Sequence, residues 1–278
     1  MKSVLEVLKS TTDYFAKAGV ENPRLNIEHL LAHTLGKRRM DLYMEFDRPL
    51  GEKELHPLRD LVRRRAAGEP LQHLLGTVEF MGRVFRTDSR ALIPRPETEQ
   101  FADRLLKLHP VPPESVLDMG TGSGILALTL ASSWPAAEVH AVDVSADALA
   151  LATANAQSLG LTERVHFHLG NLLIPPCAKP FQLLVANLPY IPSGEIAGLS
   201  REVQHDPKLA LDGGPDGGDI IRELITAARP HLQGLLALEI GHDQSVFLSE
   251  ALEQAGYRDI RAETDYQGRS RFLFASYG

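Results

Sequence analysis

Residues 115–130 read SVLDMGTGSGILALTL, and this stretch decides the fold. The apolar residues before its first glycine predict a short buried strand, and the apolar run after Gly124 predicts a helix. The glycines between them predict a tight turn. A strand, a glycine-rich turn and a helix in this order are typical of a nucleotide-binding βα unit.

The spacing of the glycines limits the class of ligand. The dinucleotide fingerprint would need its third glycine at position 125, where this chain has Ile125, so NAD is disfavoured. A phosphate-binding P-loop is not indicated either, because no Gly-Lys-Ser/Thr ending follows. The open turn is therefore expected to approach an uncharged nucleoside with an amino-acid tail. The candidate cofactor-binding residues of this turn are Gly120, Thr121, Gly122, Ser123 and Gly124.

Two aspartates follow predicted strands on either side of the turn. Asp143 ends the next strand, residues 137–143, and its carboxylate could accept hydrogen bonds from two ribose hydroxyls. The alternative is that Asp143 only caps the helix that begins near Ser145. Asp118 has a similar ambiguity, because it either orders the glycine turn by accepting backbone N–H bonds or contacts the ligand directly.

Residues 181–190 read FQLLVANLPY and end another apolar strand with a carboxamide, an X-Pro bond and an aromatic ring. An amide or exocyclic amine nitrogen is a poor nucleophile, and two acceptors can hold its hydrogens and point its lone pair at an electrophile. Asn187 and the Leu188 carbonyl are suitable acceptors, Pro189 biases Leu188 toward an extended conformation, and the Tyr190 ring can cover a flat group. Taken alone, the four residues Asn187–Tyr190 are equally well explained as a turn that follows a strand.

The amino-terminal part of the chain is predicted to be helical. Residues 1–75 are expected to form a helical bundle, with Asn22 as a capping residue, Pro23 in a first turn and Gly36 at a helix end. Residues 76–98 change to alternating β-type residues around Met81 and Gly82, which predicts a β-hairpin linker.

Residues 99–278 alternate between strands and helices, which predicts a mainly parallel sheet with its ligand at the carboxyl ends of the strands. Asp118, Asp143 and Asn187 all lie at such ends. The last two strands are expected to form an antiparallel hairpin. We expect strands near 115, 139, 165, 182, 235, 258 and 270, and helices near 125, 147, 220 and 245.

Composition is that of a cytoplasmic enzyme of two domains. The chain has 278 residues, 44% of them hydrophobic, and no apolar run that approaches membrane-spanning length. Cys177 is the only cysteine, which excludes an intramolecular disulfide. His29 and His33 lack the glutamate of a metalloprotease motif, and the histidines show no convincing ligand set, so no metal is expected.

Further sequence motifs give the chain a resemblance to a known enzyme family. The chain resembles the class I S-adenosylmethionine-dependent methyltransferases and, within them, the release-factor glutamine methyltransferase family (PrmC/HemK). The match runs through nearly the whole chain, and the run at 92–99 is its most specific element. The motifs that carry it are GEPLQ at 68–72, EFMG at 79–82, LIPRPETE at 92–99, ALDGGPDG at 210–217 and LEIG at 238–241, beside the glycine turn and the Asn187–Tyr190 loop.

The resemblance implies a Rossmann-like, mostly parallel seven-stranded sheet with a helical-bundle domain, 1–75, that docks the release factor. It implies S-adenosyl-L-methionine as cofactor, S-adenosyl-L-homocysteine as product and the glutamine of a Gly-Gly-Gln tip as the methylated group. Release factors would be the partners, and we expect a monomer with no direct contact to nucleic acid or membrane. Asn171 and Leu172 would contact adenine, although Asn171 is equally well explained as a turn former. Asn187–Tyr190 would be catalytic and, with Arg95, would bind substrate, but Arg95 could instead pair with a nearby acid.

One position departs from the family. The family usually has Asn-Pro-Pro-Tyr, whereas Leu188 makes the loop similar to that of ribosomal-RNA adenine dimethyltransferases. An N6-adenine methyltransferase acting on RNA or DNA is therefore the main alternative, and an inactive methyltransferase-fold scaffold is a third. The net charge of -7 and the lack of basic runs interleaved with aromatic residues count against a nucleic-acid substrate.

Overall fold

The computed structural model describes residues 1–172 and 179–278 and divides the chain into two compact units. The first unit contains Met1–Thr77 and Ser200–His205, and the second contains Val78–Leu199 and Asp206–Gly278. Cys177 lies outside the described residues. In the described part of the chain, no helix is both long and apolar enough to span a membrane.

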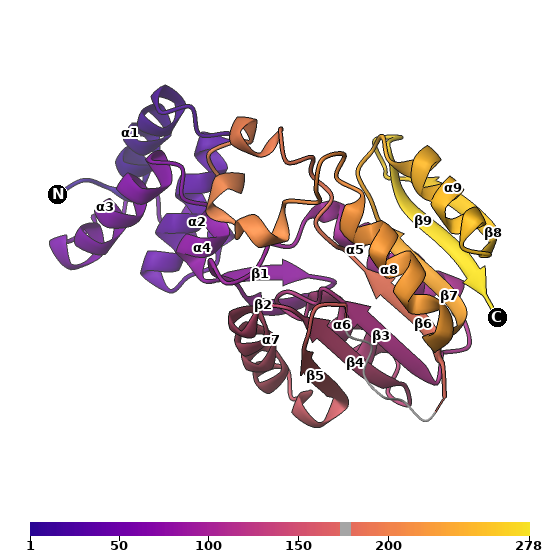
Figure 1. Ribbon diagram of the computed structural model, residues 1–278. Helices are drawn as coiled ribbons and strands as arrows, with labels where there is room; N and C mark the ends of the chain where they lie inside the picture. Colours follow the sequence, from indigo (N-terminus) through magenta and orange to yellow (C-terminus); the bar gives the residue numbers. More distant parts are fainter. Residues whose placement is uncertain (173–178) are drawn as a thin grey trace. The chain divides into compact units, whose positions relative to one another are not determined.

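The first unit is built from helices (Figure 1). They pack around a core made mainly of leucine, valine, isoleucine and phenylalanine side chains. Pro23 occupies the first turn of its second helix and Gly36 ends that helix with a left-handed φ of 62°, as the sequence predicts. Asn22 occupies the predicted N-cap position, but its side chain makes no capping hydrogen bond and its φ is 47°. The elements are α1 Val4–Lys17, α2 Pro23–Leu35, η1 Arg39–Met44, α3 Glu52–Ala66 and α4 Leu71–Leu75.

Arg65 is a buried charge at the centre of this unit, where only 3% of its surface is exposed. Its guanidinium donates to Asn26 Oδ1 at 2.7 Å and to the Glu69 carbonyl at 3.1 Å, and it forms an ion pair with Glu202. Because Glu202 belongs to the Ser200–His205 segment, this ion pair joins a segment distant in sequence to the helices. The sequence did not indicate that 200–205 belongs to this unit.

A β-hairpin of β1 Thr77–Phe80 and β2 Arg83–Arg86 follows, as the sequence predicts, and all of it except Thr77 belongs to the second unit. A helix that the sequence analysis missed follows, α5 Pro96–Leu108. Pro96 is its first residue and Glu97 and Glu99 lie in its first turn, which are usual features of a helix start. Its apolar face buries Phe101 and Leu105 against the sheet.

The main sheet has seven strands in the order β5-β4-β3-β6-β7-β9-β8 (Figure 1). β9 runs antiparallel to both of its neighbours, and the other paired strands are parallel, so the predicted parallel sheet and final hairpin are confirmed. The strands are β3 Ser115–Met119, β4 Glu138–Asp143, β5 Val165–Leu169, β6 Phe181–Ala186, β7 Leu232–Glu239, β8 Arg258–Thr264 and β9 Ser270–Tyr277.

Helices cover both faces of this sheet, and the central strands are accordingly apolar on both sides. Along β3, Val116 packs into one core with α5 and α6, whereas its neighbour Leu117 packs into the other core with α8 and α9. The same alternation holds from Leu183 to Ala186 in β6. The helices not yet given are α6 Ile125–Ser133, α7 Ala146–Ser158, α8 Asp219–Ala228 and α9 Ser245–Gln254.

Candidate functional site

A cavity of about 370 Å³ lies in the second unit at the carboxyl ends of β3, β4 and β6. Such a volume lies in the range usual for small-molecule sites, about 300–1,000 Å³. The structure brings most of the predicted site residues together in its wall. Those that line it are Gly120, Thr121, Gly122, Ser123, Asp143, Asn171, Leu172, Asn187, Leu188 and Pro189.

Asp118 orders the glycine turn from below. Its Oδ2 accepts hydrogen bonds from the Thr121 hydroxyl at 2.7 Å and from the Ala127 amide at 3.0 Å, which join the turn to the start of α6. Burial raises the pKa of Asp118 to about 6, although these hydrogen bonds lower it. In the described part of the chain Oδ1 is buried without a hydrogen-bond partner, and Asp118 also lines the cavity.

Asp143 fixes the other side of the turn. Its Oδ2 accepts from the Gly122 amide at 2.8 Å, and its Oδ1 accepts from the Ser145 amide at 2.9 Å. Ser145, and not Asp143, is the N-cap of α7, because the Ser145 hydroxyl accepts from the Ala148 amide. Each carboxylate oxygen has a second lone pair, so Asp143 can accept two further hydrogen bonds from a ligand in the cavity.

Asn187 follows β6, and its carboxamide is held in one orientation. Its Nδ2 donates to the Thr98 hydroxyl at 3.1 Å, and Thr98, on α5, is itself 2% exposed. An amide nitrogen only donates, so the polar atom that Asn187 offers to a ligand is Oδ1. Both Asn187 and Thr98 line the cavity.

Glu239 lies beside this pair because β6 and β7 are parallel neighbours, with Ala186 opposite Leu238. Burial raises the pKa of Glu239 to about 7, although hydrogen bonds with Thr98 and Asn187 and the charge of Arg271 lower it. A carboxylate only accepts, so an ionised Glu239 requires the Thr98 hydroxyl to donate to it and to accept from Asn187. The charge of Glu239 thus favours the orientation in which Asn187 Oδ1 faces the cavity.

Leu188 fills a space that its neighbours define. Its side chain is 6% exposed and packs with the residues of β3 and β6 on the α8 side of the sheet. A methyl group at Gly120 would stand 2.7 Å from Leu188 Cδ2, and Gly120 has a φ of +73°. The glycine turn and the Asn187–Tyr190 loop therefore pack directly on each other.

A second glycine-rich loop supports the residues after Leu188. Ile191 pairs with Asp212 as an isolated β-bridge. The glycine backbone also lies very close to the loop: a Cβ at Gly213 would stand 2.6 Å from the Pro189 carbonyl oxygen, and a Cβ at Gly217 would stand 2.2 Å from that of Tyr190. Gln244 Nε2 donates to the Tyr190 carbonyl at 2.8 Å. Burial raises the pKa of Tyr190 well above its usual value, which keeps the phenol neutral.

Three predicted site residues lie outside the wall of the cavity. Arg95 forms an ion pair with Asp206 at 2.6 Å. Gly124 starts α6 with a φ of +80°, and its missing side chain lets Ala152 of α7 come close. Tyr190 packs partly buried against the core on the α8 side. Asn171 and Leu172 do line the cavity, directly after β5.

Comparison with known proteins places the chain in a family. Residues 6–76 match the model of the PrmC N-terminal domain, and residues 116–205 match a methyltransferase domain. A release factor glutamine methyltransferase of Chlorobaculum tepidum is 40% identical, over 98% of this chain and 96% of its own length. The chain belongs to the release factor glutamine methyltransferase family. Its relative of the same name from Geobacter sulfurreducens is also 40% identical, over 99% and 97% of the two chains.

A solved structure agrees with the fold of this release factor glutamine methyltransferase family member. A methyltransferase from Pyrococcus furiosus superposes with a TM-score of 0.53 at 16% identity, over 82% of this chain and 100% of the other. At that identity the likeness concerns the fold alone. It supports the class I methyltransferase fold that the sequence predicts.

The sequence analysis missed several residues that shape the site in this member of the family. Thr98 and Glu239 were quoted only as parts of family motifs, Gln244 was not singled out, and Asp206 was not recognised as the acid beside Arg95. Thr98 had one usable signal, because Pro96-Glu-Thr reads as a helix start and would have placed it in a first turn. The others are brought to the site by tertiary packing.

Proposed function

We propose that this chain transfers a methyl group from S-adenosyl-L-methionine to the side-chain amide nitrogen of the glutamine in the Gly-Gly-Gln motif of peptide-chain release factors. The observation that carries the proposal is the Asn187 carboxamide, which Thr98 orients toward a cavity shared with Asp143 and the glycine turn. Family membership supports the choice of glutamine as the acceptor.

The residues of the cavity fit the cofactor. Gly120 and Gly122 present bare backbone, Asp143 keeps two lone pairs for the ribose hydroxyls, and the wall is otherwise mainly apolar. Asn171 would accept a hydrogen bond from the edge of the adenine or donate one to it, and Leu172 would pack on the adenine ring. When bound, this cofactor supplies a methyl carbon that its sulfonium has already activated. The protein therefore needs to supply position more than acid or base.

The loop residues would align the acceptor. Asn187 Oδ1 and the Leu188 carbonyl each accept one N–H of the incoming glutamine amide, Pro189 keeps that carbonyl extended, and Tyr190 supports the loop from the core side. The nitrogen forms its bond to the methyl carbon as the sulfur–carbon bond breaks, which leaves S-adenosyl-L-homocysteine. The methylated nitrogen then loses one proton to water, so no catalytic base is nominated.

Leu188 is compatible with this arrangement. The family proline and this leucine both leave the carbonyl free to accept, and here the leucine side chain is anchored by its contact with Gly120. We infer that packing of the Leu188 side chain restricts the backbone at this position, as the ring of a proline would. Arg95 would act at the entrance by holding the 92–96 segment to Asp206.

We further propose that the helical residues 1–75, joined through 76–98 to the catalytic domain 99–278, dock the release factor in the cytoplasm as a monomer. Contact with nucleic acid is disfavoured because the basic residues of the two clusters, 37–39 and 63–65, already form ion pairs with acids of the same unit. The pairs are Lys37–Glu45, Arg38–Asp41, Arg39–Glu28, Arg63–Asp60, Arg64–Glu69 and Arg65–Glu202.

The test is transfer of labelled methyl from S-adenosylmethionine to a purified release factor, beside its Gln→Ala tip variant and ribosomal RNA. We expect label on the unmodified factor alone. Asn187→Ala should lose turnover while calorimetry still detects cofactor binding, whereas Gln157→Ala, an exposed carboxamide on α7, should behave as wild type. Label on RNA alone would select the adenine alternative, and cofactor binding without any transfer would select the inactive scaffold.

A further inference from the structure

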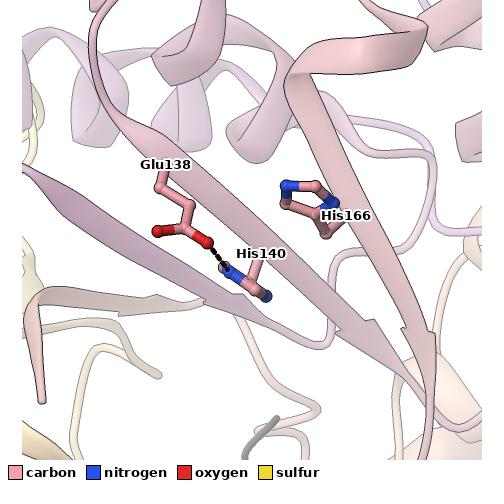
Figure 2. Close-up of side chains that lie close together, drawn as sticks. All are labelled: Glu138, His140 and His166. Atoms are coloured by element: carbon pink, nitrogen blue, oxygen red, sulfur yellow. Dashed lines mark hydrogen bonds and ion pairs between the residues drawn. The ribbon is translucent and has the colours of Figure 1, made fainter. Parts of the chain in front are cut away.

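Four side chains with metal-binding atoms lie on one face of β4 and β5, away from the cavity wall. Glu138 and His140 alternate along β4, and His166 and His168 alternate along β5, so in each strand both side chains point to the same face. The strands are parallel neighbours with His140 opposite His166. Figure 2 shows Glu138, His140 and His166 converging across this strand pair.

The distances within this cluster suit a chelating group. One ligand atom from each of Glu138, His140 and His166 lies within 4.8 Å of the others. His140 Nε2 is 3.1 Å from Glu138 Oε1, and the rings of His140 and His166 are 5.0 Å apart. Glu138 and His166 are exposed while His140 is buried, so an ion can reach the cluster from solvent and still be held against the sheet.

His168 completes the arrangement from behind. Its Nε2 lies 2.9 Å from His140 Nδ1, and the planes of the two rings are nearly parallel, at 8°. When His140 Nδ1–H donates to His168, the lone pair of His140 is on Nε2, which is the nitrogen that faces Glu138. A metal-ligating histidine usually has its second nitrogen fixed by such a partner.

We propose that Glu138, His140 and His166 form a binding site for a divalent transition-metal ion, with zinc as the best match. Two imidazoles and one carboxylate are a common three-ligand set for zinc, and the fourth tetrahedral position would hold water. His168 would orient His140 without binding the ion. The pairing of ligands from β4 and β5 was not visible as a sequence motif, because it depends on the register of two strands.

The ion would connect the edge strand β5 to its neighbour. β5 has a partner on one side only, and Leu169 at its end is 59% exposed. Because the ligands come from two strands, binding would stabilise their pairing without adding a group to the methyl-transfer cavity. The expected consequence is greater thermal stability of the metal-bound protein.

The experiment uses the full chain, without an affinity tag and stripped with a chelator, titrated with Co²⁺ as the spectroscopic probe and with Zn²⁺ by calorimetry. We expect one Co²⁺ to bind per chain, with the visible absorption of a tetrahedral site, and Zn²⁺ to displace it and raise the melting temperature. His166→Ala should weaken binding at least about tenfold, since it removes one of three ligands.

The matched control is His242→Ala, which removes an exposed histidine that also lies beside a carboxylate, Asp243, at 2.8 Å. It should bind Co²⁺ as the wild type does. Glu138→Gln, which keeps the shape of the exposed side chain, should weaken binding in the same direction as His166→Ala. Absence of saturable Co²⁺ binding, or equal affinity of wild type and His166→Ala, would overturn the proposal.

Discussion

Replacing Thr98 by valine should slow methyl transfer without removing the cofactor site. Valine has nearly the shape of threonine but cannot accept the hydrogen bond that Asn187 Nδ2 donates at 3.1 Å. Because Thr98 is 2% exposed, water cannot readily replace the lost hydroxyl. Leaving a buried donor unsatisfied costs about 1–3 kcal/mol, and the carboxamide can then turn its oxygen away from the cavity.

That free energy corresponds to a fall of about 5- to 150-fold in kcat/KM. The assay is labelled methyl transfer to a purified release factor, with cofactor affinity measured by calorimetry and folding checked by thermal melting. Thr98→Ser, which keeps the hydroxyl, should recover most of the activity. A valine variant that turns over within twofold of wild type would refute the idea that Thr98 orients Asn187, provided that its melting temperature is unchanged.

Three further outcomes are expected. Gly120→Ala should destabilise the protein by at least about 1–2 kcal/mol in urea unfolding, because φ is +73° and the new methyl would stand 2.7 Å from Leu188 Cδ2. In a Leu188→Ala background the same change should cost less, by the part that is due to the clash. Burial raises the pKa of Glu239 from 4.5 to about 7, so the contribution of this group to stability is fully present below about pH 4.5 and is lost as the pH rises through 7. The free energy of unfolding, measured in urea, should therefore differ between pH 5 and pH 8. Glu239→Gln should reduce that difference by an amount on the order of 3 kcal/mol. Arg65→Ala should cost about 1–3 kcal/mol in urea unfolding, because it leaves the buried Asn26 Oδ1 and the Glu69 carbonyl without their donor. Arg59→Ala, which removes only an exposed ion pair, should change little, and equal effects of the two variants would show that burial of Arg65 is not what matters.

The sequence was sufficient to predict the parts of the site that lie at strand ends. Asp118, Asp143 and Asn187 each follow an apolar run, and parallel strands bring their carboxyl ends to one edge of a sheet. The glycine turn could also be predicted, because three glycines between an apolar strand and an apolar helix are a local pattern in the sequence. The hairpin at the end of the chain and the parallel order of the earlier strands could likewise be predicted from local patterns.

What the sequence could not supply depends on tertiary neighbours. Glu239 looks like any acid after a strand, and only the register of β7 against β6 places it beside Asn187. The helix α5 was missed because Pro96 falls within the predicted hairpin linker, 76–98, although it is the first residue of that helix. The partner of Arg95, Asp206, lies 111 residues further along the chain, a separation that no local pattern connects.

The return of residues 200–205 to the helical unit has a consequence for any attempt to study that unit alone. A fragment that ends at Thr77 would contain Arg65 but not Glu202, so a buried guanidinium would lose the acid with which it forms an ion pair. Such a fragment is expected to fold poorly even though it contains every helix from α1 to α4. Supplying residues 200–205 through a short engineered linker, or replacing Arg65 by a long apolar side chain, would be the rational way to obtain it as an independent domain.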